Sequence, residues 1–225
     1  MIWLILLVLL VAVLVGPWYW IQYVLRRHSG VRDDYPGTGG DMARHLLDKL
    51  GLDQVGVEAT DAGDHYSRAA RCVRLTADKL DGKSLTAVVI AAHEVGHAIQ
   101  HARGEALFRA RGTLDVLAML LNRIAPIALL LAPVLVGLWP VAGRLSLLVA
   151  VGAMLVSTLV HLVTLPVEWD ASFGKALPLL RDGGYLDEQD MRHARTILTA
   201  AAFTYVAASL MSMLNVGRWL RLLRR

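Results

Sequence analysis

The chain opens with an uncharged apolar segment that restricts its possible folds more than any other feature. Residues Ile2–Leu25 carry no charged side chain, and Arg26 and Arg27 follow at once. At about 1.5 Å per residue, a helix of this length reaches about 36 Å, enough to cross the hydrocarbon core of a bilayer with some tilt. A cleaved signal peptide needs a basic start and a small-residue cleavage site, whereas this segment has neither and carries the interfacial aromatic run Trp18–Trp20. It therefore predicts an uncleaved transmembrane anchor over residues 1–25.

A second apolar region, residues Ile124–Val167, is interrupted near its middle by the sequence GLWPVAGR. The proline, glycine and arginine of this interruption favour a tight turn over a continuous membrane helix. Both flanking segments, Ile124–Val141 and Leu145–Val167, are long enough to cross a bilayer. The region therefore predicts a transmembrane helical hairpin over residues 124–167.

The basic residues lie beside the apolar segments, which predicts how the chain is oriented. The formal net charge is +4, and the hairpin tip carries only Arg144, whereas its open ends follow Arg103, Arg109, Arg111 and Arg123. The positive-inside rule then places region 26–111 in the cytoplasm. Such membrane flanks differ from a groove that tracks phosphates, so we expect the lipid bilayer, and no nucleic acid, as a partner. The single cysteine, Cys72, excludes an internal disulfide and fits a reducing compartment.

The C-terminal run Leu198–Val216 is rich in Ala, Ser and Met, and it predicts an apolar helix with a basic tail over residues 198–225. Two interpretations of this helix remain open. If it crosses the membrane, the arginines of the tail lie outside, against the charge rule. Alternatively, it packs on the other helices, with its basic end along the cytoplasmic surface. The arginines concerned are Arg218, Arg221, Arg224 and Arg225.

The polar sequence between the anchor and the hairpin predicts a small α+β domain. Asp41 can cap a helix over Met42–Leu50. Alternating residues in Val55–Thr60 and Arg71–Thr76 predict two short strands, with the sequence DAGDHYSRAA as a loop between them. The expected domain boundaries are 26–123 and, beyond the hairpin, 168–197.

The sequence HEVGHAIQH, on a predicted buried helix over Leu85–Arg103, carries the strongest functional signal. On a helix, His93 and His97 lie about 40° apart around the axis and about 6 Å apart along it, so both imidazoles can bind one ion. This spacing suits zinc, which takes three protein ligands and a water at a catalytic site. Glu94 lies near the rim of the same face, where it can accept a proton from water acidified by the cation. The motif predicts one zinc ion per chain, with Glu94 as general base.

The third zinc ligand does not follow from this motif alone. His101 lies about 12 Å from His93 along the helix axis, too far for one ion to bridge. In the longer motif H-E-x-x-H-x-x-G-x-x-H, a glycine and a third histidine stand where this chain has Gln100 and Arg103. We therefore interpret His101 as a neighbour of the site, either a hydrogen-bond partner or a substrate contact.

A downstream glutamate is the better candidate for the third ligand. Glu168, in the sequence PVEWDAS, directly follows the hairpin and should emerge on the side that holds the zinc helix. Pro166 would suit the first turn of a new helix carrying it. Two histidines and a glutamate form a known catalytic zinc set, and Asp170 or Ser172 could orient the ligands. The other candidates are Glu58, Glu105 and Glu188.

These residues resemble the bacterial membrane-bound neutral zinc metallopeptidases, which are similar to gluzincins of the prenyl-protein (CAAX) protease type. The resemblance extends from the first apolar segment to the sequence AAFTYVA near the C-terminus, and its specific parts are the zinc helix, DHY and EWDAS. It implies that His93 and His97 bind zinc and that Glu94 is the catalytic base. It also implies that Glu168 is the glutamate ligand of an E-x-x-A-[DS] motif ending at Ser172.

The expected fold is a mainly α membrane protein with a small zincin-like α+β catalytic domain. The resemblance implies a zinc metallopeptidase of the bacterial plasma membrane that acts on proteins or peptides. The apolar segments and the charge pattern predict a multi-pass protein whose catalytic domain faces the cytoplasm. The short distance from Gly104 to the hairpin favours membrane-associated substrates. An edge of strand Arg71–Thr76 could pair with an extended substrate. The alternative is a non-catalytic membrane scaffold stabilised by zinc, although such sites usually use cysteine and need no base. Candidate oxyanion donors are His65, Tyr66, His193 and Tyr205.

Overall fold

The computed structural model describes the backbone of residues 1–223. It describes their side chains except at positions 2–4, 6, 7, 10, 11, 14, 129, 208 and 210–223. The arginines of the expected basic tail therefore lie outside the described side chains. The chain divides into two compact units, Met1–Glu105 with Val167–Thr204, and Ala106–Pro166 with Tyr205–Arg225.

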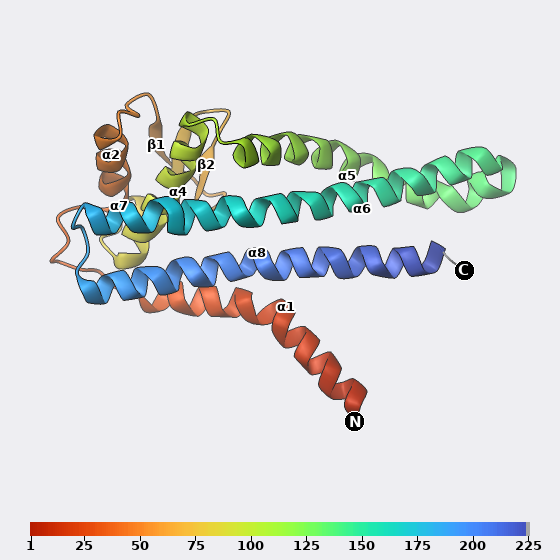
Figure 1. The fold of residues 1–225 in the computed structure, drawn as a ribbon, viewed down its shortest axis with the longest axis horizontal. Helices are drawn as coiled ribbons and strands as arrows, with labels where there is room; N and C mark the ends of the chain where they lie inside the picture. The colour runs from red at the N-terminus through yellow and green to blue at the C-terminus, as the bar shows by residue number, and fades with distance from the viewer. Residues whose placement is uncertain (224–225) are drawn as a thin grey trace. The chain divides into compact units, whose positions relative to one another are not determined.

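The first unit combines helices with a small β-sheet (Figure 1). Its strands are β1 (Gly56–Ala59), β2 (His65–Ser67) and β3 (Cys72–Leu75). Its helices are α1 (Ile2–Arg27), α2 (Gly39–Lys49), α3 (Ala77–Leu80), α4 (Leu85–Ala102), the π-helix η1 (Asp170–Ala176) and α7 (Leu177–Asp182). It also contains the end of α6 (Pro140–Trp169) and the start of α8 (Glu188–Leu223).

The start of α2 differs from the prediction. Thr38, not Asp41, caps the helix: its hydroxyl oxygen accepts a hydrogen bond from the Asp41 N–H at 3.1 Å. The Asp41 carboxylate accepts in return from the Thr38 N–H at 2.8 Å, which completes a capping box. Asp41 is therefore the third helical residue. The predicted end is confirmed, because Gly51 takes a φ of 67° just beyond the helix.

The sheet has the order β1-β3-β2, with β3 parallel to β1 and antiparallel to β2. The two predicted strands are confirmed as β1 and β3, and Cys72 is buried in β3. The expected loop DAGDHYSRAA contains the third strand, β2, which is too short to show alternation of apolar and polar residues. Because β3 pairs on both sides, the expectation that it offers an edge to a substrate is wrong.

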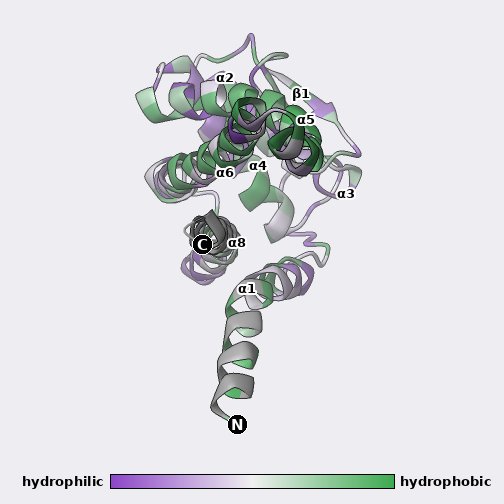
Figure 2. Ribbon diagram, turned by 90° about the vertical axis from the view of Figure 1, so that its right-hand side faces the viewer, coloured by the Kyte–Doolittle hydropathy of each residue, from purple (hydrophilic) through white to green (hydrophobic). Residues whose placement is uncertain are grey.

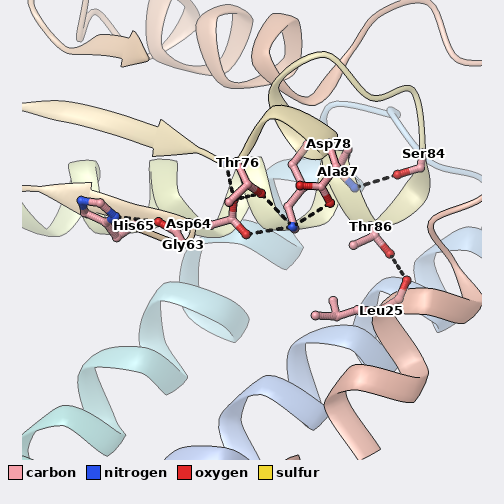
Figure 3. Close-up of polar contacts among 10 residues, drawn as sticks. Leu25, Gly63, Asp64, His65, Thr76, Asp78, Ser84, Thr86 and Ala87 are labelled. Atoms are coloured by element: carbon pink, nitrogen blue, oxygen red, sulfur yellow. Dashed lines mark hydrogen bonds and ion pairs between the residues drawn. The ribbon is translucent and has the colours of Figure 1, made fainter. Parts of the chain in front are cut away.

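Helix α4 lies in the core of the first unit and packs against α2, η1 and β3 (Figure 1). Its residues from Leu85 to Gln100 are buried except Ile90, as predicted. Ser84 caps it by accepting from the Ala87 N–H at 3.1 Å. The hydroxyl of Thr86 donates to the Leu25 carbonyl at 2.9 Å, which ties the start of α4 to the end of α1 (Figure 3).

The second unit contains α5 (Ala106–Leu138), most of α6 and the C-terminal part of α8. A single residue, Trp139, separates α5 from α6, so the turn predicted at GLWPVAGR is confirmed. Gly143 permits this close turn, because a Cβ atom there would lie 2.6 Å from the backbone nitrogen of Val136. The prediction for Pro166 is wrong: it lies inside α6, which continues through it with the loss of one backbone hydrogen bond.

Among the described residues, one continuous helical segment, Pro140–Asp182, is long and apolar enough to cross a membrane. It comprises α6, η1 and α7, and little of its most apolar part is buried. Helix α5 meets the same criteria when its segments Ala106–Ala128 and Leu130–Leu138, which bend by 55°, are taken together. The bend lies at residue 129, four residues before Pro133. The ring of a proline inside a helix clashes with the carbonyl group four residues earlier, which explains the bend. Figure 2, which views α5 and α6 nearly along their axes, shows mostly hydrophobic residues on both helices. The fold is mainly helical, and the expected anchor and multiple spans stay predictions.

Candidate metal and active site

Two segments far apart in sequence meet at the candidate site. Helix α4 carries the HEVGH sequence, and Glu168 lies near the end of α6, just before η1. Gly96, within HEVGH, contacts η1 so closely that a Cβ atom there would lie 2.7 Å from the Ala171 carbonyl oxygen. The absence of a side chain at residue 96 therefore lets the two backbones approach, which brings Glu168 to the histidines.

The structure brings His93, His97 and Glu168 into one cluster, with their ligand atoms within 4.8 Å of one another. The Nε2 atoms of His93 and His97 lie 3.2 and 3.3 Å from the same oxygen, Oε2 of Glu168. All three side chains are buried, and Glu168 is only 2% exposed. Glu58 and Glu105, which were alternatives for the third ligand, instead form ion pairs with basic side chains at 3.3 and 3.0 Å.

These separations fit a zinc ion. Zinc binds imidazole nitrogens and carboxylate oxygens at about 2.0–2.2 Å in tetrahedral sites, which places two ligand atoms about 3.3–3.6 Å apart. The distances from the two histidines to Glu168, 3.2 and 3.3 Å, lie just below and at the lower end of this range. Among the described residues, the cluster contains three side chains of ligand type, the number found at catalytic zinc sites. The donor set therefore suits zinc with a fourth position for water or substrate.

Each histidine of the cluster is held by a hydrogen bond at Nδ1. The hydroxyl of Ser172, predicted to orient a ligand, lies 3.1 Å from Nδ1 of His93. Nδ1 of His97 lies 2.9 Å from Oε1 of Gln100, a residue that in the sequence stands out only as a departure from a longer zinc motif. Its place three residues after His97, on the same helix face, is the signal that could have identified it. Asp170 contacts the Gln100 amide at 2.8 Å.

Glu94 lies on the same helix with one carboxylate oxygen, Oε2, that is buried and has no hydrogen-bond partner among the described residues. Burial raises the pKa of Glu94 to about 7, and the charge of Glu168 adds to this effect, whereas His93 and the backbone N–H of Tyr66 oppose it. A carboxyl group with a pKa near neutrality can both take and return a proton. A buried oxygen without a partner is uncommon in folded proteins and indicates a place for water or substrate.

Strand β2 contacts α4 and carries the sequence DHY. The hydroxyl of Tyr66 is hydrogen bonded to Nδ1 of His101 at 2.8 Å. Burial lowers the pKa of His101, and the charges of two nearby arginines act in the same direction. A neutral His101 can then accept a hydrogen bond from the hydroxyl of Tyr66. This contact places His101 beside the site as a hydrogen-bond partner, which was one of its two expected roles.

Asp64 anchors the start of β2 to the end of β3. Its Oδ1 accepts from the backbone N–H of Thr76 at 2.7 Å and from the Thr76 hydroxyl at 2.9 Å (Figure 3). The ammonium group of Lys79, which is mostly buried, lies 3.1 Å from its other oxygen. The histidine of DHY, His65, bonds through Nδ1 to the carbonyl of Gly63 at 2.8 Å. Polar contacts on both sides therefore fix this short strand.

Two other candidate residues are not part of the cluster. The ring of His193 packs against His28, with centroids 4.7 Å apart. Tyr205 belongs to the second unit. Their proposed roles as oxyanion donors therefore stay predictions.

Comparison with known proteins identifies the family. Residues 2–224 match the family described as "Putative neutral zinc metallopeptidase". The chain belongs to this family. "Putative membrane protease YugP" of Bacillus subtilis (strain 168) is 32% identical to it over 212 residues, which cover 91% of this chain and 90% of that protein. No solved structure matches the chain. In a member of the neutral zinc metallopeptidase family, zinc is the metal expected at His93, His97 and Glu168.

Proposed function

We propose that the chain is a zinc endopeptidase in which His93, His97 and Glu168 hold one zinc ion and Glu94 is the general base. The observation that carries this proposal is the unpartnered Oε2 of Glu94, next in sequence to the first of three side chains whose ligand atoms lie within 4.8 Å of one another. A purely structural zinc site would need no free carboxylate at that position. Family membership and the relative described as a membrane protease support peptide bonds as the target.

Zinc and Glu94 would each have a separate part in the hydrolysis of the peptide bond. Zinc, when bound, supplies a Lewis acid that polarises the scissile carbonyl and lowers the pKa of water. Oε2 of Glu94 takes a proton from the attacking water, and the resulting carboxyl group donates it to the nitrogen of the leaving amine. Burial raises the pKa of Glu94, whereas a bound zinc ion would lower it again. Ser172 orients His93, and burial of the ligands by α4 and η1 excludes bulk water behind them.

Strand β2 would hold the substrate in an extended conformation. It forms an edge of the sheet, so the backbone groups of its outer side are available for pairing with a peptide. The backbone N–H of Tyr66 lies close enough to influence Glu94. A peptide aligned along β2 would therefore pass beside the general base. Of the four candidate oxyanion donors, His65 and Tyr66 lie on this strand.

The site would face the cytoplasm from a multi-pass protein of the plasma membrane. One apolar helix and a relative named a membrane protease support membrane association. The arginines beside the apolar segments support the cytoplasmic orientation. Membrane-associated proteins or peptides would then be the natural substrates.

The ligand set is tested by measuring zinc per chain in detergent-purified wild type, Glu168→Ala and His101→Ala. We expect about one zinc ion in wild type and in His101→Ala, and much less in Glu168→Ala, because three protein ligands hold the ion. Retention of zinc in Glu168→Ala together with loss in His101→Ala would overturn the proposed ligands.

Catalysis is tested by cleavage of membrane and unfolded soluble proteins. Glu94→Gln should keep its zinc and lose about 10²–10⁴-fold in rate, whereas Glu188→Gln, at an exposed position, should cleave normally. Full activity in Glu94→Gln would refute the proposed base. A wild type that binds zinc, cleaves nothing and unfolds on chelation would instead be a zinc-stabilised scaffold.

A further inference from the structure

The buried amide of Gln100 lies where three parts of the site meet. The residue is 1% exposed and follows His97 by one turn of α4. Its Oε1 lies 2.9 Å from Nδ1 of His97, and its Nε2 lies 2.9 Å from the carbonyl oxygen of Val167, at the end of α6. The same Nε2 lies 2.8 Å from the carboxylate of Asp170, in η1. One side chain thus connects a candidate ligand to Val167 and Asp170, which lie on either side of Glu168 in the sequence.

The carbonyl of Val167 determines which way this amide faces. A carbonyl oxygen can only accept, so the group of Gln100 that faces it must be the NH2. The second proton of that NH2 points to Asp170. The amide oxygen is left for His97, and it too can only accept. His97 must therefore donate from Nδ1, which in the neutral ring leaves the lone pair on Nε2, the atom that faces Glu168 and would bind a metal.

We propose that Gln100 is a positioning residue that fixes the Nδ1-protonated tautomer of His97 and so makes Nε2 its metal-binding nitrogen. This inference rests on the zinc site proposed above. The other ligand, His93, lacks such control, because the Ser172 hydroxyl at its Nδ1 can either donate or accept. Gln100 therefore restricts His97 to one tautomer, whereas Ser172 allows either tautomer of His93.

A buried lysine supports the orientation of the amide. Lys175 is 6% exposed, and its ammonium group contacts the same Asp170 oxygen that accepts from Gln100. It also lies 3.0 Å from the carboxylate of Glu105, just beyond the end of α4. These contacts hold Asp170 beside the amide. A continuous series of polar contacts thus runs from His97 to the segment that follows α4.

Nitrogen NMR of the metal-free, histidine-labelled protein reads the tautomer directly, with His97→Ala assigning the signal. We expect Nδ1 to carry the proton in wild type and in Gln100→Glu, whose carboxylate can also accept. Gln100→Met keeps the length of the side chain without an acceptor, so it should give a mixture of tautomers. Protonation at Nε2 without protonation at Nδ1 in wild type would overturn the inference, and this result does not depend on peptidase activity.

Zinc affinity, measured by competition with a chelator, tests the consequence of this tautomer. Gln100→Met should bind zinc about 10–100-fold more weakly, Gln100→Glu should lose less, and the exposed control Gln189→Met should be unchanged. Equal affinity in wild type and Gln100→Met would overturn the positioning role. If Gln100→Met does not fold, the NMR signals of wild type and Gln100→Glu still test whether His97 carries its proton at Nδ1. Absence of zinc from wild type would refute the proposed function instead.

Discussion

Helix α4 and strand β2 both carry residues of the candidate site, but different interactions hold them in place. Helix α4 is buried along nearly its whole length and meets η1 through direct backbone contact at Gly96. Strand β2 is three residues long and half-buried, and side chains at Asp64 and Tyr66 anchor it. The metal-binding face thus depends on close packing, whereas the proposed substrate edge depends on a few polar contacts. Mutations should therefore separate zinc binding from substrate binding.

The largest effect is expected from Gly96→Ala, which adds a Cβ atom 2.7 Å from the Ala171 carbonyl oxygen. Backbone is the obstacle here, so α4 and η1 must move apart, at a cost of about 1–3 kcal/mol in the free energy of unfolding. That movement also shifts Glu168 away from the histidines. Thermal unfolding should show the loss of stability, and metal analysis should show the loss of most zinc.

Gly152→Ala is the matched control, because a Cβ atom at this helical glycine meets nothing within 4 Å. It should be neutral, or more stable by up to about 1 kcal/mol, since alanine favours helix. A Gly96→Ala protein with wild-type zinc content would show that the close approach of α4 to η1 is not what brings Glu168 to the site.

An intermediate effect is expected when the anchor of β2 is removed by Asp64→Ala. The backbone N–H of Thr76 loses its acceptor and Lys79 loses one of its carboxylate partners, which should cost about 1–3 kcal/mol. Because β2 would no longer be fixed beside α4, we expect KM for a peptide substrate to rise while zinc content stays at the wild-type value. Kinetics and metal analysis on the same preparation measure both.

The exposed Asp53→Ala substitution controls for the loss of one negative charge, and it should change neither KM nor zinc content. If Asp64→Ala lost zinc in proportion to activity, strand β2 would be needed for zinc binding as well as for substrate binding. The comparison between α4 and β2 would then fail.

The same contrast explains what could be predicted from the sequence. The zinc helix follows a fixed period, so the spacing of His93 and His97 and the neighbouring position of Glu94 could be derived from the residues alone. Glu168 could be placed only through the topology of the apolar segments, and the structure brings it to both histidines. Gln100 and strand β2 could not be assigned, because their roles depend on contacts with residues distant in sequence. The prediction that Pro166 begins a new helix was wrong, because α6 continues through this residue.

The smallest effect is expected at Cys72, in the central strand β3. The side chain is 2% exposed, and burial raises the pKa of the thiol to about 11. In the unfolded chain, a cysteine thiol has a pKa of about 8.5. The contribution of this group to stability is therefore complete below about pH 8.5 and is lost as the pH rises from there to about 11, because the unfolded state releases the proton first. The midpoint of thermal unfolding should fall more steeply in this window for wild type than for Cys72→Ala.

Alkylation of Cys72 tests the same burial and extends the comparison of α4 with the sheet. At pH 8 the native protein should react slowly with iodoacetamide, because the buried thiol stays protonated, whereas protein unfolded in detergent should react completely. Since β3 pairs with both β1 and β2, Cys72 can react quickly only if the sheet opens. Fast labelling in protein that keeps its zinc would mean that the sheet opens while α4 and η1 stay together. Slow labelling that becomes fast only when zinc is removed would mean instead that the metal stabilises β2 as well as α4.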